Sequence, residues 1–250
     1  MVDVSAYLAR INYSGPTEPS GETLRSIHRA HLIAVPFENL DISLGREIVL
    51  DEEAIVNKIV ALRRGGFCYE LNGAFAALLR ALEFRVTLLS ARVARPDGGE
   101  GPDFDHLTLR VDLEYPWLAD VGFGESFLEP LRLEAGRDQQ DSTGTYRLLE
   151  QGERLQLEKS LPDGGWKAQY SFSLQSRRLE DFAGMCRFRQ TSPESSFTQK
   201  RICTRATPDG RITLSQMRLI TTNKGQREER SLTSEEELRS TLHEKFGIHL

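Results

Sequence analysis

Residues 63–83 read RRGGFCYELNGAFAALLRALE, and this stretch sets the character of the first third of the chain. Gly65 and Gly66 break any preceding helix, and a new helix is expected to start near Cys68 and to run to about Glu83. Apolar side chains recur along it at spacings of three and four, at Leu71, Phe75, Leu78, Leu79 and Leu82. That spacing is typical of a buried helical stripe, so the sequence predicts a buried helix with a cysteine at its start.

Two further helices are expected upstream. Ser20 is placed to cap the first, which Pro36 ends because the residue before a proline avoids the helical conformation. Asp51 is placed to cap the second, which the two glycines end. Residues 1–84 are therefore predicted to form a helical domain.

The pattern changes after this region. RVTLLSARVA (85–94) and HLTLRVDLE (106–114) have strand composition, and apolar residues alternate with polar ones in the second. WLADVGFG (117–124) is expected to be a short strand that runs into a glycine turn. Turn signals recur at 151–152 and 162–165, which predicts a series of hairpins over residues 85–189, hence a barrel or a sandwich.

Residues 190–250 return to a mixed pattern. PDG (208–210) and NKG (223–225) are typical of hairpin turns. Ser234 and Glu237 have the spacing of a capping box for a final helix, and Gly247 stands where a helix C-cap glycine belongs.

Composition narrows the class of protein. The chain has 250 residues, of which 39% are hydrophobic and 28% charged, an ordinary globular balance that argues against disorder, collagen and coiled coil. The net charge of −5 makes a general nucleic-acid binder improbable. No stretch approaches the roughly 20 apolar residues of a membrane helix, and no signal peptide is apparent. Three cysteines without close pairing favour a reducing compartment, so we expect a cytoplasmic protein.

Cys68 is the first candidate for chemistry. The thiolate is the nucleophilic form of cysteine, and both a helix N-terminus and the neighbouring Arg63 and Arg64 favour it. Taken alone, a buried cysteine that acts only as a small apolar side chain is about as probable.

A reactive cysteine needs a base, and His106 is the best placed of the five histidines because it begins a strand after a glycine-rich loop. His28 and His31 lie on an expected helix, where packing or surface roles are usual. Asp120 lies in an apolar run in which an ionised group needs a partner, so it is the candidate to orient His106. The alternatives are a polar residue on the strand face opposite the leucines for His106 and a turn residue for Asp120.

The flanking sequence of these residues resembles a known family. RGGFCYELNGAF (64–75) looks like the active-site signature of the arylamine N-acetyltransferases. VPFENLD (35–41), DHLTLRV (105–111), WLADVGFG (117–124) and SPESSFTQK (192–200) also resemble blocks of that family and occur in its order. The three candidate catalytic positions show no departure from it.

The resemblance implies an α+β fold with an N-terminal helical bundle (1–84), a central antiparallel β-barrel (85–189) and a C-terminal α/β lid (190–250). It implies a cysteine-protease-like core in which Cys68 is the nucleophile, His106 the base and Asp120 the orienting carboxylate. It also implies acetyl-CoA as the donor and an arylamine or arylhydrazine as the acceptor. No metal, nucleic acid or membrane partner is expected.

Substrate contacts are predicted from the same blocks. Phe37, Phe67 and Phe123 are candidates to line a flat apolar acceptor pocket, although core packing is an equal alternative for Phe67. Gly122 and Gly124 are candidates to aim N–H groups at the CoA pyrophosphate or at an oxyanion. A net excess of basic residues over 200–230 is a candidate phosphate site, with a solvated strand surface as the alternative; these are Lys200, Arg201, Arg205, Arg211, Arg218, Lys224, Arg227 and Arg230.

Other functions compete with this prediction. The same residues serve papain- and transglutaminase-like hydrolases, and amide synthases of the same family, while a non-catalytic binding protein would require loss of a triad residue. Should Asp120 be a turn residue, Asp103 and Asp105 are the next candidates to orient His106. Cys186 and Cys203 are expected to be structural thiols.

Overall fold

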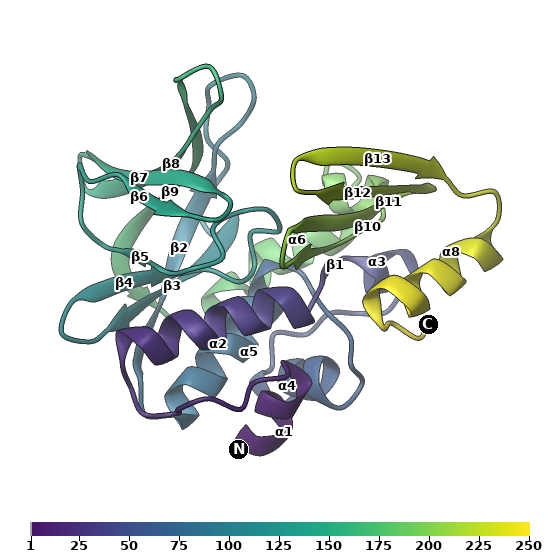
Figure 1. Ribbon diagram of the computed structural model, residues 1–250, viewed down its shortest axis with the longest axis horizontal. Coiled ribbons are helices and arrows are strands. Elements are labelled where there is room, and N and C mark those ends of the chain that lie inside the picture. Colours follow the sequence, from purple (N-terminus) through teal and green to yellow (C-terminus); the bar gives the residue numbers. More distant parts are fainter. Residues whose placement is uncertain (1) are drawn as a thin grey trace.

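The N-terminal part of the chain is helical, as predicted, in a computed structural model that describes residues 2–250 (Figure 1). Its helices are α1 (Val4–Arg10), α2 (Gly21–Ala34), α3 (Leu40–Ser43), α4 (Glu52–Val60) and α5 (Cys68–Ala81). Ser20 and Asp51 cap α2 and α4 by accepting N–H hydrogen bonds of 3.1 and 2.9 Å, as predicted. Figure 1 shows α2 and α5 lying between the barrel on one side and α1 and α4 on the other.

Two helix ends differ from the prediction. Helix α5 is buried from its first residue through Leu79, which confirms the buried helix, but it ends ahead of Glu83 because that residue already has a left-handed φ of +64°. Helix α4 ends at Val60, well before the glycines. The buried guanidinium of Arg10 donates a 2.9 Å hydrogen bond to the Ile59 carbonyl and so satisfies the end of the helix from outside.

The middle of the chain forms the predicted series of hairpins. Its strands are β2 (Arg85–Val93), β3 (His106–Asp112), β4 (Pro116–Ala119), β5 (Leu131–Arg132), β6 (Gln139–Asp141), β7 (Gly144–Gln151), β8 (Arg154–Ser160) and β9 (Trp166–Arg177). They make one antiparallel sheet in the order β5-β4-β3-β2-β9-β8-β7-β6. A bridge between Ala135 and Leu148 brings the two ends of the sheet together, so that the barrel is nearly closed.

Strand β3 shows how the sequence positions the site. Leu107, Leu109 and Val111 belong to the same buried core as helix α5, so this face of the strand packs on the helices. Side chains alternate along a strand, and His106 and Thr108 therefore lie on the opposite face. The predicted alternation is confirmed, and it aims His106 away from the leucines.

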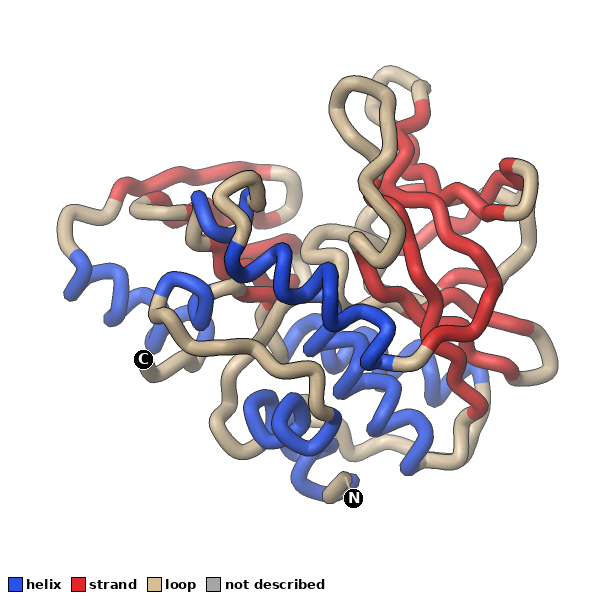
Figure 2. Tube along the Cα trace, turned by 180° about the vertical axis from the view of Figure 1, so that it is seen from behind, coloured by secondary structure: helices blue, strands red, loops and turns tan. Residues whose placement is uncertain are grey.

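The C-terminal part contains a second sheet and four helical segments besides its final turn. Its elements are η1 (Leu179–Phe182), α6 (Ala183–Thr191), α7 (Ser196–Gln199), β10 (Ile202–Thr207), β11 (Gly210–Ser215), β12 (Arg218–Asn223), β13 (Gln226–Ser231), α8 (Glu235–Thr241) and the π-helical turn η2 (Leu242–Phe246). We call its sheet the lid sheet. The hairpins at 208–210 and 223–225 are confirmed. Figure 2 shows α6 running from the barrel toward the lid sheet.

The lid sheet also contains a strand that the sequence did not predict. Strand β1 (Phe37–Glu38), which follows α2, pairs with β10 and makes the sheet order β1-β10-β11-β12-β13. The N-terminal part and the lid sheet are therefore joined by backbone hydrogen bonds, and Phe37 is held at the edge where they meet.

The last helix follows the predicted caps with one difference. Ser234 accepts the Glu237 N–H at 3.1 Å, but the Glu237 carboxylate accepts from the Thr233 N–H at 2.7 Å and not from Ser234. The Glu237 side chain is also paired with Arg230, which draws it toward β13. Gly247 has the left-handed φ of +69° expected of a C-cap glycine.

Candidate active site

Cys68 is the first residue of α5, and its side chain is buried. The turn that places it is fixed by Glu70, whose carboxylate accepts the Phe67 N–H at 3.1 Å. Lys58 on α4 donates to the other oxygen of Glu70 at 2.6 Å, so that carboxylate is held on both sides. The N-terminal end of α5 thus presents its unpaired N–H groups and its positive dipole end near the thiol.

His106 and Asp120 come from paired strands, since His106 begins β3 and Asp120 follows β4. Both side chains are buried, and His106 Nε2 lies 2.6 Å from Asp120 Oδ2. The Cys68 thiol is the other neighbour of this imidazole and favours its protonated form. Because Nε2 is engaged by Asp120, Nδ1 is the ring nitrogen left for the thiol, and the three predicted catalytic residues lie in one row.

The charges of this row support one another. Burial opposes protonation of His106, but the negative charge of Asp120 and the hydrogen bond to it outweigh burial and raise the pKa of His106 to about 10. Burial also opposes ionisation of Asp120, yet the charge of His106 and several hydrogen bonds hold the pKa of Asp120 below its ordinary value. Both shifts favour the charged forms, an imidazolium and a carboxylate, and an imidazolium is the counter-charge that a thiolate needs.

Asp120 is held by a complete set of hydrogen bonds. Asn72 Nδ2 and the Gly122 N–H each donate to Oδ1 at 2.9 Å, and the Tyr170 hydroxyl donates to Oδ2 at 2.8 Å. The backbone N–H of Asp120 donates to His28 Nε2 at 3.0 Å. These contacts fix the carboxylate in position and compensate for its burial.

His28 is an unpredicted member of this arrangement. Since its Nε2 accepts from Asp120, its Nδ1 carries the hydrogen and donates to the Leu128 carbonyl at 2.9 Å. Burial lowers the pKa of His28 to about 4, so the ring is neutral. Of the supporting residues, only Asn72 had a signal in the sequence, because it lies four residues after Cys68 on the same helix face. His28 and Tyr170 had none.

Gly122 is required by close approach. A Cβ atom at this position would lie 2.8 Å from Cys68 Cα and 2.6 Å from Asn72 Nδ2. Its N–H is already donated to Asp120, so the expectation that Gly122 offers this N–H to CoA does not fit the geometry. Gly124 has a left-handed φ of +91° and lies against the ring of Phe37.

The three predicted phenylalanines occupy different places. Phe123 is partly exposed and packs edge-on against His106, with ring centres 5.2 Å apart. Phe37 is also partly exposed and adjoins Gly124. Phe67 is fully buried between Tyr69 and Phe197, so it lies behind the site.

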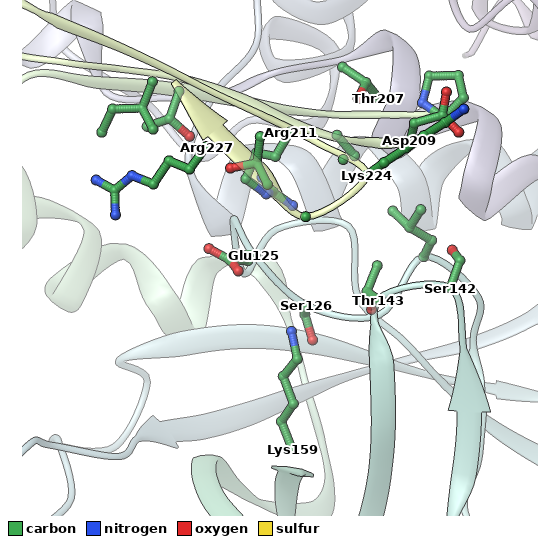
Figure 3. Close-up of a pocket in the computed structure, with 18 residues that line it drawn as sticks. Glu125, Ser126, Ser142, Thr143, Lys159, Thr207, Asp209, Arg211, Lys224 and Arg227 are labelled. Atoms are coloured by element: carbon green, nitrogen blue, oxygen red, sulfur yellow. The ribbon is translucent and has the colours of Figure 1, made fainter. Parts of the chain in front are cut away.

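A cleft of about 820 Å³ lies between the barrel and the lid sheet (Figure 3). Its lining includes Glu125 and Ser126, which directly follow the loop that holds Asp120, Phe123 and Gly124. Figure 3 shows Arg211 and Lys224 on the lid side and Lys159 on the barrel side.

The cleft receives three of the eight basic residues predicted as a phosphate site, namely Arg211, Lys224 and Arg227. Most of the others are engaged elsewhere, in ion pairs with carboxylates for Arg201, Arg218 and Arg230 and in hydrogen bonds to carbonyls for Arg205. Arg227 is itself paired with Glu229 at 3.2 Å, so the predicted phosphate site is reduced to Arg211 and Lys224 in the cleft.

The alternative carboxylates for His106 have other partners. Asp103 pairs with Arg92 at 2.8 Å, and Asp105 forms an ion pair with Arg189. Cys186 and Cys203 are buried, and burial raises the pKa of both thiols, that of Cys186 to about 12. Neither is placed to act as a nucleophile near neutral pH.

Residues 2–250 contain no group of three or more His, Cys, Asp or Glu side chains arranged to hold a metal ion. No helix in that range combines the length and the apolar character needed to cross a membrane.

A buried cysteine at a helix N-terminus, with a histidine on one strand and an aspartate directly after the paired strand, is an arrangement suited to thiol-dependent acyl transfer. Comparison with known proteins also indicates acyl transfer. The family model for N-acetyltransferases matches residues 21–250. The arylamine N-acetyltransferase of Escherichia coli K12 is 36% identical over 246 residues, which cover 97% of this chain and 87% of that protein. The chain therefore belongs to the arylamine N-acetyltransferase family, and it is an acyltransferase.

Solved structures show the same fold. The arylamine N-acetyltransferase of Mycobacterium marinum is 37% identical with a TM-score of 0.92, over 98% of this chain and 93% of that one. The enzyme of Salmonella typhimurium is 36% identical with a TM-score of 0.93, over 99% and 92%. A structure of the Mycobacterium marinum protein in complex with CoA superposes with a TM-score of 0.91, at 37% identity over 98% and 93%. The predicted α+β class, with helices, a barrel and a lid sheet, is confirmed.

Proposed function

We propose that this protein transfers the acetyl group of acetyl-CoA to the nitrogen of an arylamine or arylhydrazine through an acetylated Cys68. The observation that carries the proposal is the row of Cys68, His106 and Asp120, in which a 2.6 Å contact joins the last two and the thiol neighbours the imidazole. Cys68 is the nucleophile and His106 the acid and base. Asp120 orients His106 and stabilises its protonated form.

In the first half-reaction the Cys68 thiolate attacks the carbonyl carbon of the thioester. The tetrahedral intermediate collapses as the bond to the CoA sulfur breaks, and the His106 imidazolium gives its proton to that sulfur. One thioester replaces another, so the step is nearly balanced in free energy. The products are CoA, acetyl-Cys68 and a neutral His106.

In the second half-reaction the amine nitrogen attacks the acetyl-cysteine. An aromatic amine is weakly basic and is neutral at pH 7, so its lone pair is available. The new C–N bond forms, the bond to Cys68 Sγ breaks, and His106 takes the proton from nitrogen. The imidazolium and the thiolate are restored together. Asp120 raises the pKa of His106 to about 10 against the effect of burial, and this raised pKa suits both half-reactions.

The acceptor side is apolar. Phe123 stands against His106, and Phe37 adjoins the same loop through Gly124. A flat ring between them would bring its nitrogen toward the thioester and exclude water, which favours transfer over hydrolysis. Phe67 supports this wall from behind.

The cleft between the barrel and the lid sheet suits CoA. Its lining includes Glu125, two residues after Phe123, and the cations Lys159, Arg211 and Lys224, which match the phosphate groups of the nucleotide. The CoA complex of the Mycobacterium marinum protein supports CoA as the co-substrate. Gly124 remains the glycine proposed to offer its N–H to the bound acyl donor.

We also infer a reducing, cytoplasmic location. All three cysteines are free and buried in the described part of the chain, and a thiol nucleophile works only while it stays reduced.

Intact mass spectrometry after incubation with acetyl-CoA tests the proposal. A single acetyl group should appear on Cys68, persist in water and disappear when an aniline is added. Cys68→Ser should remain unmodified, whereas Cys186→Ser should be acetylated like the wild type. Parallel double-reciprocal plots should follow from the covalent intermediate. Intersecting plots, or acetylation of Cys68→Ser, would exclude this mechanism, and rapid loss of the adduct in water would indicate a hydrolase.

A further inference from the structure

The turn that leads into His106 is strained. Phe104, two residues earlier, has a φ of +63°, a left-handed conformation that bulky side chains rarely adopt. Such a conformation is unfavourable and persists only where the surroundings determine it. Because His106 follows directly, whatever holds this turn also sets the position of the imidazole.

Tyr69 is one of the groups that hold the turn. Its hydroxyl donates to the Phe104 carbonyl at 2.8 Å and lies 3.3 Å from the Asp105 carbonyl. The Phe104 N–H is satisfied separately by the hydroxyl of Ser90 at 2.8 Å. Tyr69 is the residue after Cys68, so a single hydroxyl links the segment of the nucleophile to the segment of the base.

Arg189 on α6 completes the arrangement. Its guanidinium forms an ion pair with the carboxylate of Asp105, and its positive charge acts on the nearby Tyr69 hydroxyl. The side chains of Asp105 and Arg189 are only 4% and 18% exposed, so solvent screens the pair little. A side chain at Gly101 would overlap the Asp105 carboxylate, which is therefore enclosed on that side too.

We propose that Tyr69, Asp105 and Arg189 form a clamp that fixes the separation between the Cys68 thiol and the His106 ring. They are positioning residues, since they act through the backbone before His106 and have no part in the proposed bond-making steps. The inference rests on the proposed function, in which the His106 imidazolium stands beside the attacking Cys68 thiolate and gives its proton to the leaving CoA sulfur. Misplacement by about 1 Å can lower the rate of such a step by up to roughly a hundredfold.

The test uses three conservative variants of the full chain, Tyr69→Phe, Asp105→Asn and Arg189→Lys. Three quantities are measured for each: the single-turnover rate of Cys68 acetylation, the pH dependence of Cys68 alkylation by iodoacetamide, and the thermal midpoint. Tyr69→Phe is expected to slow acetylation about tenfold and to change the KM for acetyl-CoA less than about twofold. Its alkylation profile should shift, because the thiol and the imidazole no longer keep their native separation.

Arg147→Gln is the matched control. It removes an ion pair of similar burial between β7 and β8, where Arg147 lies 2.7 Å from Glu158. It should change the thermal midpoint but leave both the acetylation rate and the alkylation profile as in the wild type. Should Asp105→Asn fail to fold, Tyr69→Phe and Arg189→Lys still decide the question.

The outcomes separate the two claims. Clamp variants that lose thermal stability but keep the wild-type acetylation rate and alkylation profile would overturn the clamp. Wild-type protein that never acetylates Cys68 would overturn the proposed function, while the alkylation profiles would still report on the clamp. A slower rate with a shifted profile in every variant that folds supports the clamp.

Discussion

Asp120 carries the charge on which the other two residues of the row depend. In Asp120→Asn the shape is kept, but the charge that outweighs burial and raises the pKa of His106 to about 10 is removed. Burial remains and favours the neutral ring, so the imidazolium that accompanies the thiolate is lost at neutral pH. We expect transfer activity to fall by about a thousandfold or more, and alkylation of Cys68 at pH 7 to slow in parallel.

The pKa values of His106 and Asp120 in the wild type give the direction in which stability changes with pH. A raised histidine pKa means that the ion pair contributes its full stability below the ordinary value of about 6.5 and loses it as the pH rises through about 10. The stability difference between wild type and Asp120→Asn, measured by urea unfolding, should therefore shrink on the alkaline side. On the acid side it should shrink as Asp120, whose pKa is lowered, takes up a proton. A difference that is constant from pH 4 to 11 would contradict the ion pair.

A site residue could be predicted from the sequence only where its neighbours along the chain form a distinctive pattern. Cys68, His106 and Asp120 each lie in a distinctive flanking stretch, so they were found. His28 on helix α2 and Tyr170 on strand β9 contact Asp120 although they lie 92 and 50 residues away from it along the chain. Such contacts depend on strand register and helix packing, which a single sequence does not reveal.

At the scale of elements, the loop after β4 must pass directly over the start of α5. Gly122→Ala would place a Cβ 2.8 Å from Cys68 Cα and 2.9 Å from Cys68 O, both backbone atoms that have little freedom to move. We expect a loss of about 1–3 kcal/mol in unfolding free energy. Acetylation should fall more than that loss implies, because the displaced loop carries Asp120 and Phe123. Chemical unfolding and single-turnover kinetics measure the two effects.

Gly73→Ala is the control on the same helix. Its added Cβ would meet only ordinary contacts, the nearest 3.5 Å away, and alanine is the better helix former. It should unfold no more easily than the wild type and acetylate at the same rate. Equal behaviour of Gly122→Ala would show that the loop can move away without consequence.

The elements that the sequence predicted well are those whose pattern is long. The stripe of α5 and the alternation of β3 each rest on several residues, so both were found. Strand β1 has only two residues and pairs with β10 from the far end of the chain, so no local pattern could indicate it. The early end of α4 was not predicted for a similar reason, because the partner of its Ile59 carbonyl is Arg10, a residue of α1.

At the scale of the whole molecule, the cleft lies where the barrel and the lid sheet face each other, so each part supplies some of its charge. Arg211 comes from β11 and Lys159 from β8, which are in different sheets. Much of the Arg211 surface is out of solvent, and burial lowers its pKa. A cation held in this way gains most when a phosphate restores the lost solvation.

Arg211→Gln should therefore weaken recognition of the nucleotide part of CoA without disturbing the thiol. We expect the KM for acetyl-CoA to rise about tenfold, the worth of one charge-assisted phosphate contact, while kcat changes little. S-acetylpantetheine, which lacks the nucleotide and its phosphates, should be used equally well by Arg211→Gln and the wild type. Arg218→Gln is the control, because Arg218 lies on the same sheet but is exposed and paired with Glu229. If Arg211→Gln loses activity equally with acetyl-CoA and with S-acetylpantetheine, the Arg211 side chain supports the lid sheet through Thr204 and does not bind phosphate.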